Sequence, residues 1–120
     1  MAFSGNSGLT RILKACRFSW QGLCAAYGHE AAFRQEIWAS LVLIPAGFWF
    51  GNNGVEKALL IGPVLLLLLV EILNSSIEAV VDRIGEEQHE LAGRAKDMGS
   101  AAVAIAIVLL IVIWVLVLAG

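Results

Sequence analysis

The chain has 120 residues, of which 59% are hydrophobic and 15% are charged, and its mean hydropathy is +0.82. This composition excludes an ordinary water-soluble domain, because so short a chain cannot hide this much apolar surface from water. The formal net charge of -2 says little about function by itself. We expect no nucleic-acid partner. We therefore expect one all-α integral-membrane domain over residues 1–120.

The segment over about residues 9–27 predicts an amphipathic helix, with Thr10 as its N-cap and the basic residues away from the apolar stripe. A basic amphipathic helix that contains tryptophan and tyrosine suits the membrane surface. Packing of this helix on the protein's own core is the alternative. Cys16 and Cys24 would lie about 12 Å apart along such a helix, too far for a disulfide.

Three apolar segments follow, over about residues 31–50, 58–81 and 101–120. Each has about 20 residues or more, which is the length that a helix needs to cross a bilayer. Residues 51–54 predict a turn between the first two. A charged loop over residues 82–97 is expected before the third.

The basic residues predict the orientation of the chain in the membrane. Of the eight Lys and Arg residues, only Lys57 falls on the side opposite the N-terminus. The positive-inside rule therefore places the N-terminus and the 82–97 loop in the cytoplasm, and the C-terminus outside.

Polar residues form a stripe along the helix predicted for the second span. Glu71, Asn74, Glu78 and Asp82 recur at steps of three and four, so they share one helix face. Glu71 would lie about 10 Å deeper in the membrane than Glu78. An ionisable group costs about 3 kcal/mol or more at the bilayer centre, and it therefore normally faces protein, water or a partner. We expect the function of the protein in this polar stripe.

Carboxylates, an amide and nearby cations are groups that suit a magnesium–nucleotide complex. Mg²⁺ is usually held by one or two carboxylates plus phosphate oxygens, and Lys or Arg would counter the charge of a transferring phosphoryl group. A buried carboxylate could act as general base on an alcohol. The sequence has no Gly-x-x-x-x-Gly-Lys-Ser/Thr loop and no Gly-x-Gly-x-x-Gly. From the residues alone, an ion or proton pathway is an equal alternative, and a purely structural role is a third.

Three stretches of the sequence are long and unusual in composition. They are Glu30-Ala-Ala-Phe-Arg-Gln-Glu36, Glu71-Ile-Leu-Asn-Ser-Ser-Ile-Glu-Ala-Val-Val-Asp-Arg-Ile-Gly85 and His89-Glu-Leu-Ala-Gly-Arg-Ala-Lys-Asp-Met-Gly-Ser-Ala-Ala102. At these stretches the chain resembles the prokaryotic diacylglycerol kinase family, which are small integral-membrane lipid kinases. The resemblance extends back through Thr10-Arg-Ile-Leu-Lys-Ala and Ser19-Trp-Gln-Gly-Leu, while Phe18 and Gln21 depart mildly from the family pattern.

The resemblance implies that the γ-phosphate of MgATP is transferred to the free hydroxyl of diacylglycerol, which gives phosphatidic acid for phospholipid recycling. It implies a homotrimer in the bacterial inner membrane, with three spans and one surface helix per chain and a periplasmic C-terminus. It also implies active sites that are shared between neighbouring subunits.

The resemblance further assigns roles to individual residues. Glu71 looks like the general base, Glu30 and Glu78 look like the carboxylates that hold Mg²⁺ with ATP, and Asn74 and Asp82 resemble supporting positions. The implied nucleotide-binding positions are Arg11, Phe18, Glu30, Glu78, Glu87, Gln88, His89, Lys96 and Asp97. The implied lipid-binding positions are Arg11, Ser19, Trp20, Ala32, Phe33, Arg34, Gln35, Glu36, Glu71 and Ser100.

Two other functions stay open at this point. A sister branch phosphorylates undecaprenol with the same core motif, although the Arg-Gln-Glu and Arg-Ile-Gly stretches here resemble the diacylglycerol branch. Outside the kinases, the alternative is a small cation-coupled membrane transporter.

Overall fold

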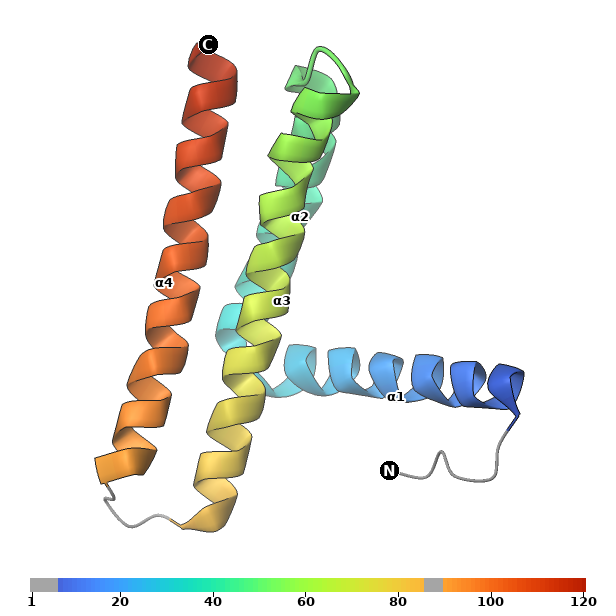
Figure 1. Cartoon of the computed structure of the whole chain (residues 1–120), viewed down its shortest axis with the longest axis vertical. Helices are drawn as coiled ribbons and strands as arrows, with labels where there is room; N and C mark the ends of the chain where they lie inside the picture. The colour runs from blue at the N-terminus through green and yellow to red at the C-terminus, as the bar shows by residue number, and fades with distance from the viewer. Residues whose placement is uncertain (1–6, 86–89) are drawn as a thin grey trace.

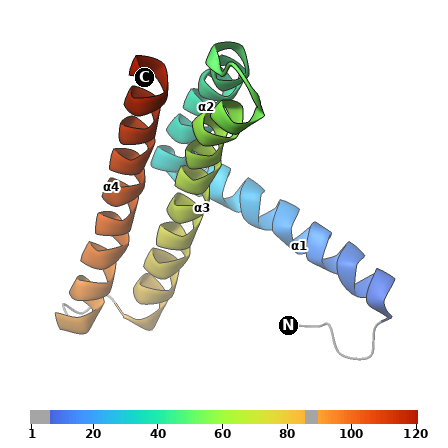
Figure 2. The same ribbon diagram turned by 45° about the horizontal axis from the view of Figure 1, so that its top comes forward.

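The computed structural model describes residues 7–85 and 90–120, which form four helices. Their bounds are α1 Gly8–His29, α2 Ala31–Phe50, α3 Gly54–Ile84 and α4 Glu90–Ala119. α3 contacts both α2 and α4, and α1 leaves this bundle at a steep angle (Figure 1 and Figure 2). No strand is present in the described ranges, so the all-α prediction is confirmed.

α1 begins at a side-chain cap and ends at a sharp corner. The Ser7 hydroxyl oxygen accepts a hydrogen bond of 3.3 Å from the Thr10 N–H. Ser7 is therefore the N-cap and the prediction of Thr10 is wrong, because the cap must stand just outside the helix to reach its free N–H groups. At the other end, Glu30 has extended backbone (φ −117°, ψ 109°), which turns the chain into α2.

α2 and α3 form an antiparallel hairpin across the predicted turn. The side chain of Asn53 caps α3, since its Oδ1 accepts a hydrogen bond of 2.9 Å from the Glu56 N–H. Gly47 allows the two helices to approach closely. A Cβ atom at this position would lie 2.9 Å from Ile61 Cγ1 and 3.2 Å from Leu60 Cβ. The glycine thus sets the distance between α2 and α3.

α4 runs beside α3 along most of its length (Figure 1). Near its C-terminal end, Trp114 Nε1–H donates a hydrogen bond of 2.9 Å to the Leu60 carbonyl oxygen of α3. Gly99 and Ala106 are the buried residues of α4. Small side chains at these positions let α4 lie against α3, while many of its large apolar side chains, such as Ile105 and Leu116, are exposed.

The charged segment over residues 82–97, predicted to be a loop, is mostly helical. α3 continues to Ile84, where Gly85 caps it, and α4 begins at Glu90. Residues 86–89 lie outside the described residues. Glu, Lys and Arg favour helix nearly as well as leucine, so a change from apolar to charged composition does not end a helix.

Little of the chain is buried within one copy. Phe33, Leu60, Val64 and Ala106 are buried, whereas Trp49 is 82% exposed. Many other large apolar side chains of the bundle are exposed in the same way. Apolar surface on this scale is covered by lipid or by another protein.

Of the described helices, α3 and α4 are long and apolar enough to cross a membrane. α2 is not among them, because Arg34, Gln35 and Glu36 occupy its first turns. The structure therefore confirms a helical protein with two membrane-capable helices, and the third predicted span stays a prediction.

Candidate active site

Glu71 is the buried carboxylate of α3. Only 5% of this residue is exposed. One turn further along, Asn74 Nδ2 donates a hydrogen bond of 2.8 Å to Glu78 Oε1, and the Asn74 side chain also interacts with Glu71. Asn74 thus links Glu71 and Glu78, two of the three carboxylates of the polar stripe, as residues three and four apart on a helix do.

Two further carboxylates approach Glu71 from outside α3. Glu30 stands at the corner between α1 and α2, and Glu36 lies in the second turn of α2. Both are close enough to Glu71 to interact with it electrostatically, and so is Glu78. We call Glu30, Glu36, Glu71 and Glu78 the carboxylate cluster. Because like charges disfavour one another's ionisation, the cluster needs protons or a cation among its members.

The carboxylate cluster suits a magnesium ion that arrives with a phosphate ligand. Glu30 and Glu78 are both half-buried and offer carboxylate oxygens at its rim. Mg²⁺ usually takes one or two carboxylates plus substrate phosphates, and it seldom sits in a cage made by protein alone. Over residues 7–85 and 90–120, no group of three or more His, Cys, Asp or Glu is arranged to hold a metal ion by itself.

Two oxygen atoms in this region have no partner among the described residues. They are Glu36 Oε2 and Asn74 Oδ1, and both atoms are buried. A buried acceptor without a hydrogen bond is costly, and a ligand or an ordered water normally satisfies it. Each of the two oxygens can therefore accept a further hydrogen bond.

A lysine of α4 lies next to the carboxylate cluster. Lys96 Nζ is 2.7 Å from Asp82 Oδ1, which joins α4 to the end of α3. The hydrogen bond from Lys96 to Asp82 raises the pKa of the lysine, and the negative charges of Asp82 and Glu78 act in the same direction. Both partners are exposed, so the pair adds little to stability. Its consequence is a fixed positive charge beside the carboxylates.

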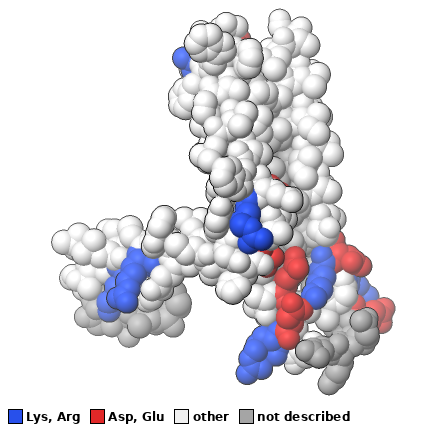
Figure 3. All heavy atoms as spheres, turned by 180° about the vertical axis from the view of Figure 1, so that it is seen from behind, with Lys and Arg blue, Asp and Glu red and all other residues white. Residues whose placement is uncertain are grey.

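Charged side chains gather at this end of the bundle, where α3 ends and α4 begins (Figure 3). The opposite half of the bundle is almost free of them in the same view. A polar ligand that arrives from water would therefore meet the protein at the charged end.

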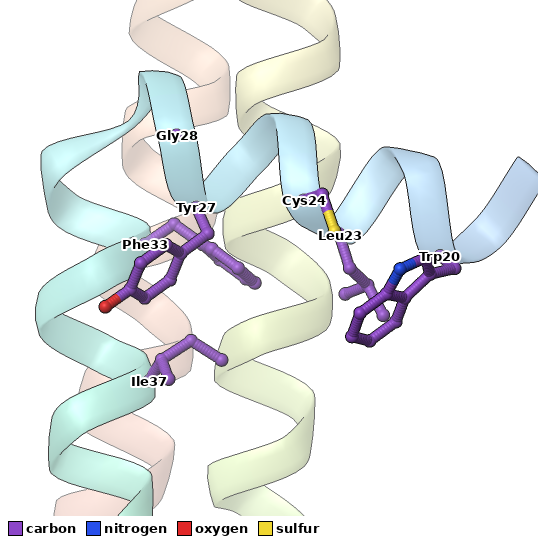
Figure 4. Close-up of a pocket in the computed structure, with 7 residues that line it drawn as sticks. All are labelled: Trp20, Leu23, Cys24, Tyr27, Gly28, Phe33 and Ile37. Carbon is purple, nitrogen blue, oxygen red and sulfur yellow. The ribbon is translucent and has the colours of Figure 1, made fainter.

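An apolar pocket of about 410 Å³ opens between α1 and α2 (Figure 4). The second half of α1 contributes Trp20, Leu23 and Tyr27, and α2 contributes Phe33 and Ile37. The volume lies in the range of small-molecule sites. The structure thus brings together Trp20 and Phe33, two of the positions that the family resemblance implies for lipid binding.

Arg34, also predicted to contact lipid, holds the corner beside this pocket. Its Nη1 donates hydrogen bonds of 2.8 Å to the Tyr27 carbonyl and 3.2 Å to the Gly28 carbonyl. These carbonyls belong to the last turn of α1, where a helix has no acceptor partners of its own. Arg34 therefore fixes α1 against α2.

The remaining predicted positions are not gathered into one site within a single chain. Arg11 lies in the first turns of α1, at the end that points away from the bundle (Figure 1). Exposed positions on the helices are Phe18, Ser19, Ala32, Gln35, Asp97 and Ser100. Glu87, Gln88 and His89 lie outside the described residues.

Gly99 belongs to this site, and the sequence reasoning missed it. It is buried on α4 against Asn74, and a Cβ atom at position 99 would overlap Asn74 Oδ1. A single glycine inside a helical segment carries no signal of such a contact. Only the docking of α4 on α3 reveals it.

Exposed apolar helices, a carboxylate cluster around the buried Glu71, a neighbouring lysine and an apolar pocket define a helical membrane protein with a polar site at one end of its bundle. The sequence model of a family described as prokaryotic diacylglycerol kinase matches residues 17–118. The chain belongs to the prokaryotic diacylglycerol kinase family.

Curated relatives agree with this assignment. The diacylglycerol kinase of Escherichia coli (strain K12) is 54% identical over 115 residues, which cover 96% of this chain and 94% of the relative. The diacylglycerol kinase of Pseudomonas aeruginosa is 48% identical over 118 residues, covering 98% and 96%. The diacylglycerol kinase of Haemophilus influenzae is 47% identical over 108 residues, covering 90% and 92%.

Proposed function

We propose that this chain transfers the γ-phosphate of ATP to the free hydroxyl of diacylglycerol and so produces phosphatidic acid. The family and the names of its relatives support kinase activity toward diacylglycerol. The observation that carries the proposal in this chain is the buried Glu71, which is linked through Asn74 to Glu78, while Lys96 lies near Glu78.

In the proposed reaction, Glu71 is the general base. The lipid hydroxyl oxygen attacks the γ-phosphorus, and the bond between that phosphorus and the oxygen bridging to ADP breaks. The hydroxyl proton passes to the Glu71 carboxylate, and ADP leaves with the bridging oxygen. Burial suits this role, because a desolvated carboxylate binds a proton more readily.

Glu30 and Glu78 would hold Mg²⁺ with the nucleotide, and the bound ion would neutralise charge on the phosphates. Lys96 adds a positive charge on the same side of the bundle. Asp97, Arg11 and Phe18 would contact the nucleotide, as would Glu87, Gln88 and His89. Asn74 and Asp82 support this site by holding Glu78 and Lys96 in place.

The lipid substrate would enter from the membrane beside α1. The apolar pocket at Trp20 and Phe33 suits the apolar part of a lipid, and α1 would lie on the membrane surface as an amphipathic helix. Further lipid contacts would come from Ser19, Ala32, Arg34, Gln35, Glu36 and Ser100, and Arg11 would contact lipid as well as nucleotide.

The proposal includes the arrangement in the membrane. α2 would span the inner membrane together with α3 and α4, with its polar first turns at the cytoplasmic interface. The N-terminus and residues 82–97 would face the cytoplasm, and the C-terminus the periplasm. Three chains would form a homotrimer with shared active sites, which would bring Arg11 of one chain to a neighbouring site.

One experiment tests this proposal together with its two alternatives, undecaprenol kinase activity and cation transport. The purified full chain in mixed micelles is given MgATP with a labelled γ-phosphate and, in separate reactions, diacylglycerol, undecaprenol or no lipid alcohol. We expect labelled phosphatidic acid as the main product. Preferential labelling of undecaprenol would move the chain to the sister activity. A chain that labels no lipid alcohol at any Mg²⁺ concentration would contradict the kinase proposal and favour cation transport.

A further inference from the structure

The contact between Gly99 and Asn74 joins α4 to the carboxylate cluster. Gly99 is buried, and its missing side chain leaves the space that the Asn74 side-chain oxygen occupies. The amide nitrogen of the same Asn74 donates the 2.8 Å hydrogen bond to Glu78. The two ends of one short side chain are thus held from opposite sides, one by α4 and the other by a carboxylate.

The orientation of Asn74 depends on this space. If a methyl group stood at position 99, the cheapest adjustment would be a rotation of the asparagine, because its amide is the movable part. Rotation would take Nδ2 away from Glu78 Oε1. Asn74 Oδ1 is buried without a hydrogen-bond partner among the described residues, so only the interactions of Asn74 with Glu78 and Glu71 hold the amide in its present orientation.

We propose that Gly99 is a positioning residue, which fixes the Asn74 amide and through it orients the Glu78 carboxylate for binding the nucleotide-bound cation. This inference rests on the proposed function for the role of Glu78. Partners that orient a metal ligand typically contribute about 10- to 100-fold to metal affinity. Gly99 would act in this way without touching nucleotide, lipid or metal.

Gly47 provides a matched control within the same chain. It is also a buried helical glycine at a close helix–helix approach, but a Cβ there would meet only the side chains of Leu60 and Ile61. A Gly47→Ala variant therefore crowds an apolar contact far from the carboxylate cluster. Gly99→Ala instead crowds the polar side chain of Asn74, next to the carboxylate cluster.

The test measures the Mg²⁺ concentration that half-saturates phosphate transfer, together with Mg²⁺-dependent nucleotide binding at equilibrium and thermal unfolding. We expect Gly99→Ala to raise the half-saturating Mg²⁺ concentration by about 10- to 100-fold in both transfer and binding. Gly47→Ala should lower thermal stability and leave the Mg²⁺ dependence unchanged. A Gly99→Ala variant with the Mg²⁺ dependence of the parent would overturn the proposal.

A double variant tests whether the effect passes through Asn74. In an Asn74→Ala background the obstructing oxygen is absent, so adding Gly99→Ala should change neither nucleotide binding nor the unfolding temperature further. If Gly99→Ala weakens nucleotide binding equally in the parent and in the Asn74→Ala background, Gly99 acts by a route other than Asn74 and the inference is refuted. Unfolding and binding need no phosphate transfer, so this cycle still decides about Gly99 if the parent proves not to be a lipid kinase.

Discussion

On the proposed function, the neighbours of Glu78 would orient this side chain before a cation binds. Its Oε1 accepts the hydrogen bond from Asn74, and it interacts electrostatically with Glu71 and Lys96. A carboxylate held in this way keeps its second oxygen available for a ligand. Such support from neighbours is typical of carboxylates that bind metals.

Replacing Glu78 by glutamine removes the charge and keeps the shape. The glutamine side chain would still offer an oxygen to Asn74, so we expect the fold to persist. Phosphate transfer by Glu78→Gln should fall by about 100-fold or more, because even the partners of a metal ligand contribute about 10- to 100-fold to affinity. Raised Mg²⁺ should restore only part of the rate. Glu56→Gln, at the other end of α3, is the control, and near-normal turnover of Glu78→Gln at limiting Mg²⁺ would exclude the metal role.

At the scale of elements, the corner between α1 and α2 decides where the apolar pocket opens. Glu30 provides the extended backbone of the corner, and Arg34 holds the last carbonyls of α1. The pocket lies directly beside this corner, with Tyr27 and Gly28 in its wall. The angle of α1 and the shape of the pocket are therefore coupled through one arginine.

The variant Arg34→Gln should loosen this corner. Glutamine cannot reach both carbonyls, and the lost hydrogen bonds should cost about 1.5 kcal/mol, the low end for a charged donor, because they are exposed to solvent. We expect faster hydrogen exchange in the last turn of α1, with α3 and α4 unchanged. Arg17→Gln, in the middle of α1, is the control. Equal exchange in Arg34→Gln and the parent would show that Arg34 does not hold the corner.

The helices themselves were predictable, whereas several of their boundaries and contacts were not. The apolar run over 31–50 matches the bounds of α2, because the Gly-Asn-Asn-Gly turn ends it. The charged composition near Asp82 and Lys96 predicts a loop, but both residues are helical. Composition indicates which residues are exposed, and an exposed segment can still be helical. The Asn74 to Glu78 hydrogen bond follows from helical spacing. The Gly99 contact does not, since it depends on how α4 docks on α3.

At the scale of the whole molecule, apolar and polar surfaces are strongly separated. α4 buries only Gly99 and Ala106 among its residues, while Ile105 is 69% exposed. This apolar surface needs hydrocarbon or other copies of the chain around it. Charge is concentrated at the end of the bundle near the carboxylate cluster (Figure 3). On the proposed function, the nucleotide and the membrane lipid would therefore meet at that end.

The role of Glu71 is tested most directly by comparing phosphate transfer and nucleotide binding in the Glu71→Gln variant. Glutamine keeps the size and the hydrogen bonding of the side chain but cannot take up a proton. We expect MgATP to bind about as tightly as to the parent, while labelled phosphatidic acid forms about 10²- to 10⁴-fold more slowly, the usual contribution of a general base. An undiminished transfer rate in Glu71→Gln, with the parent active in the same assay, would contradict the assignment of Glu71 as the base.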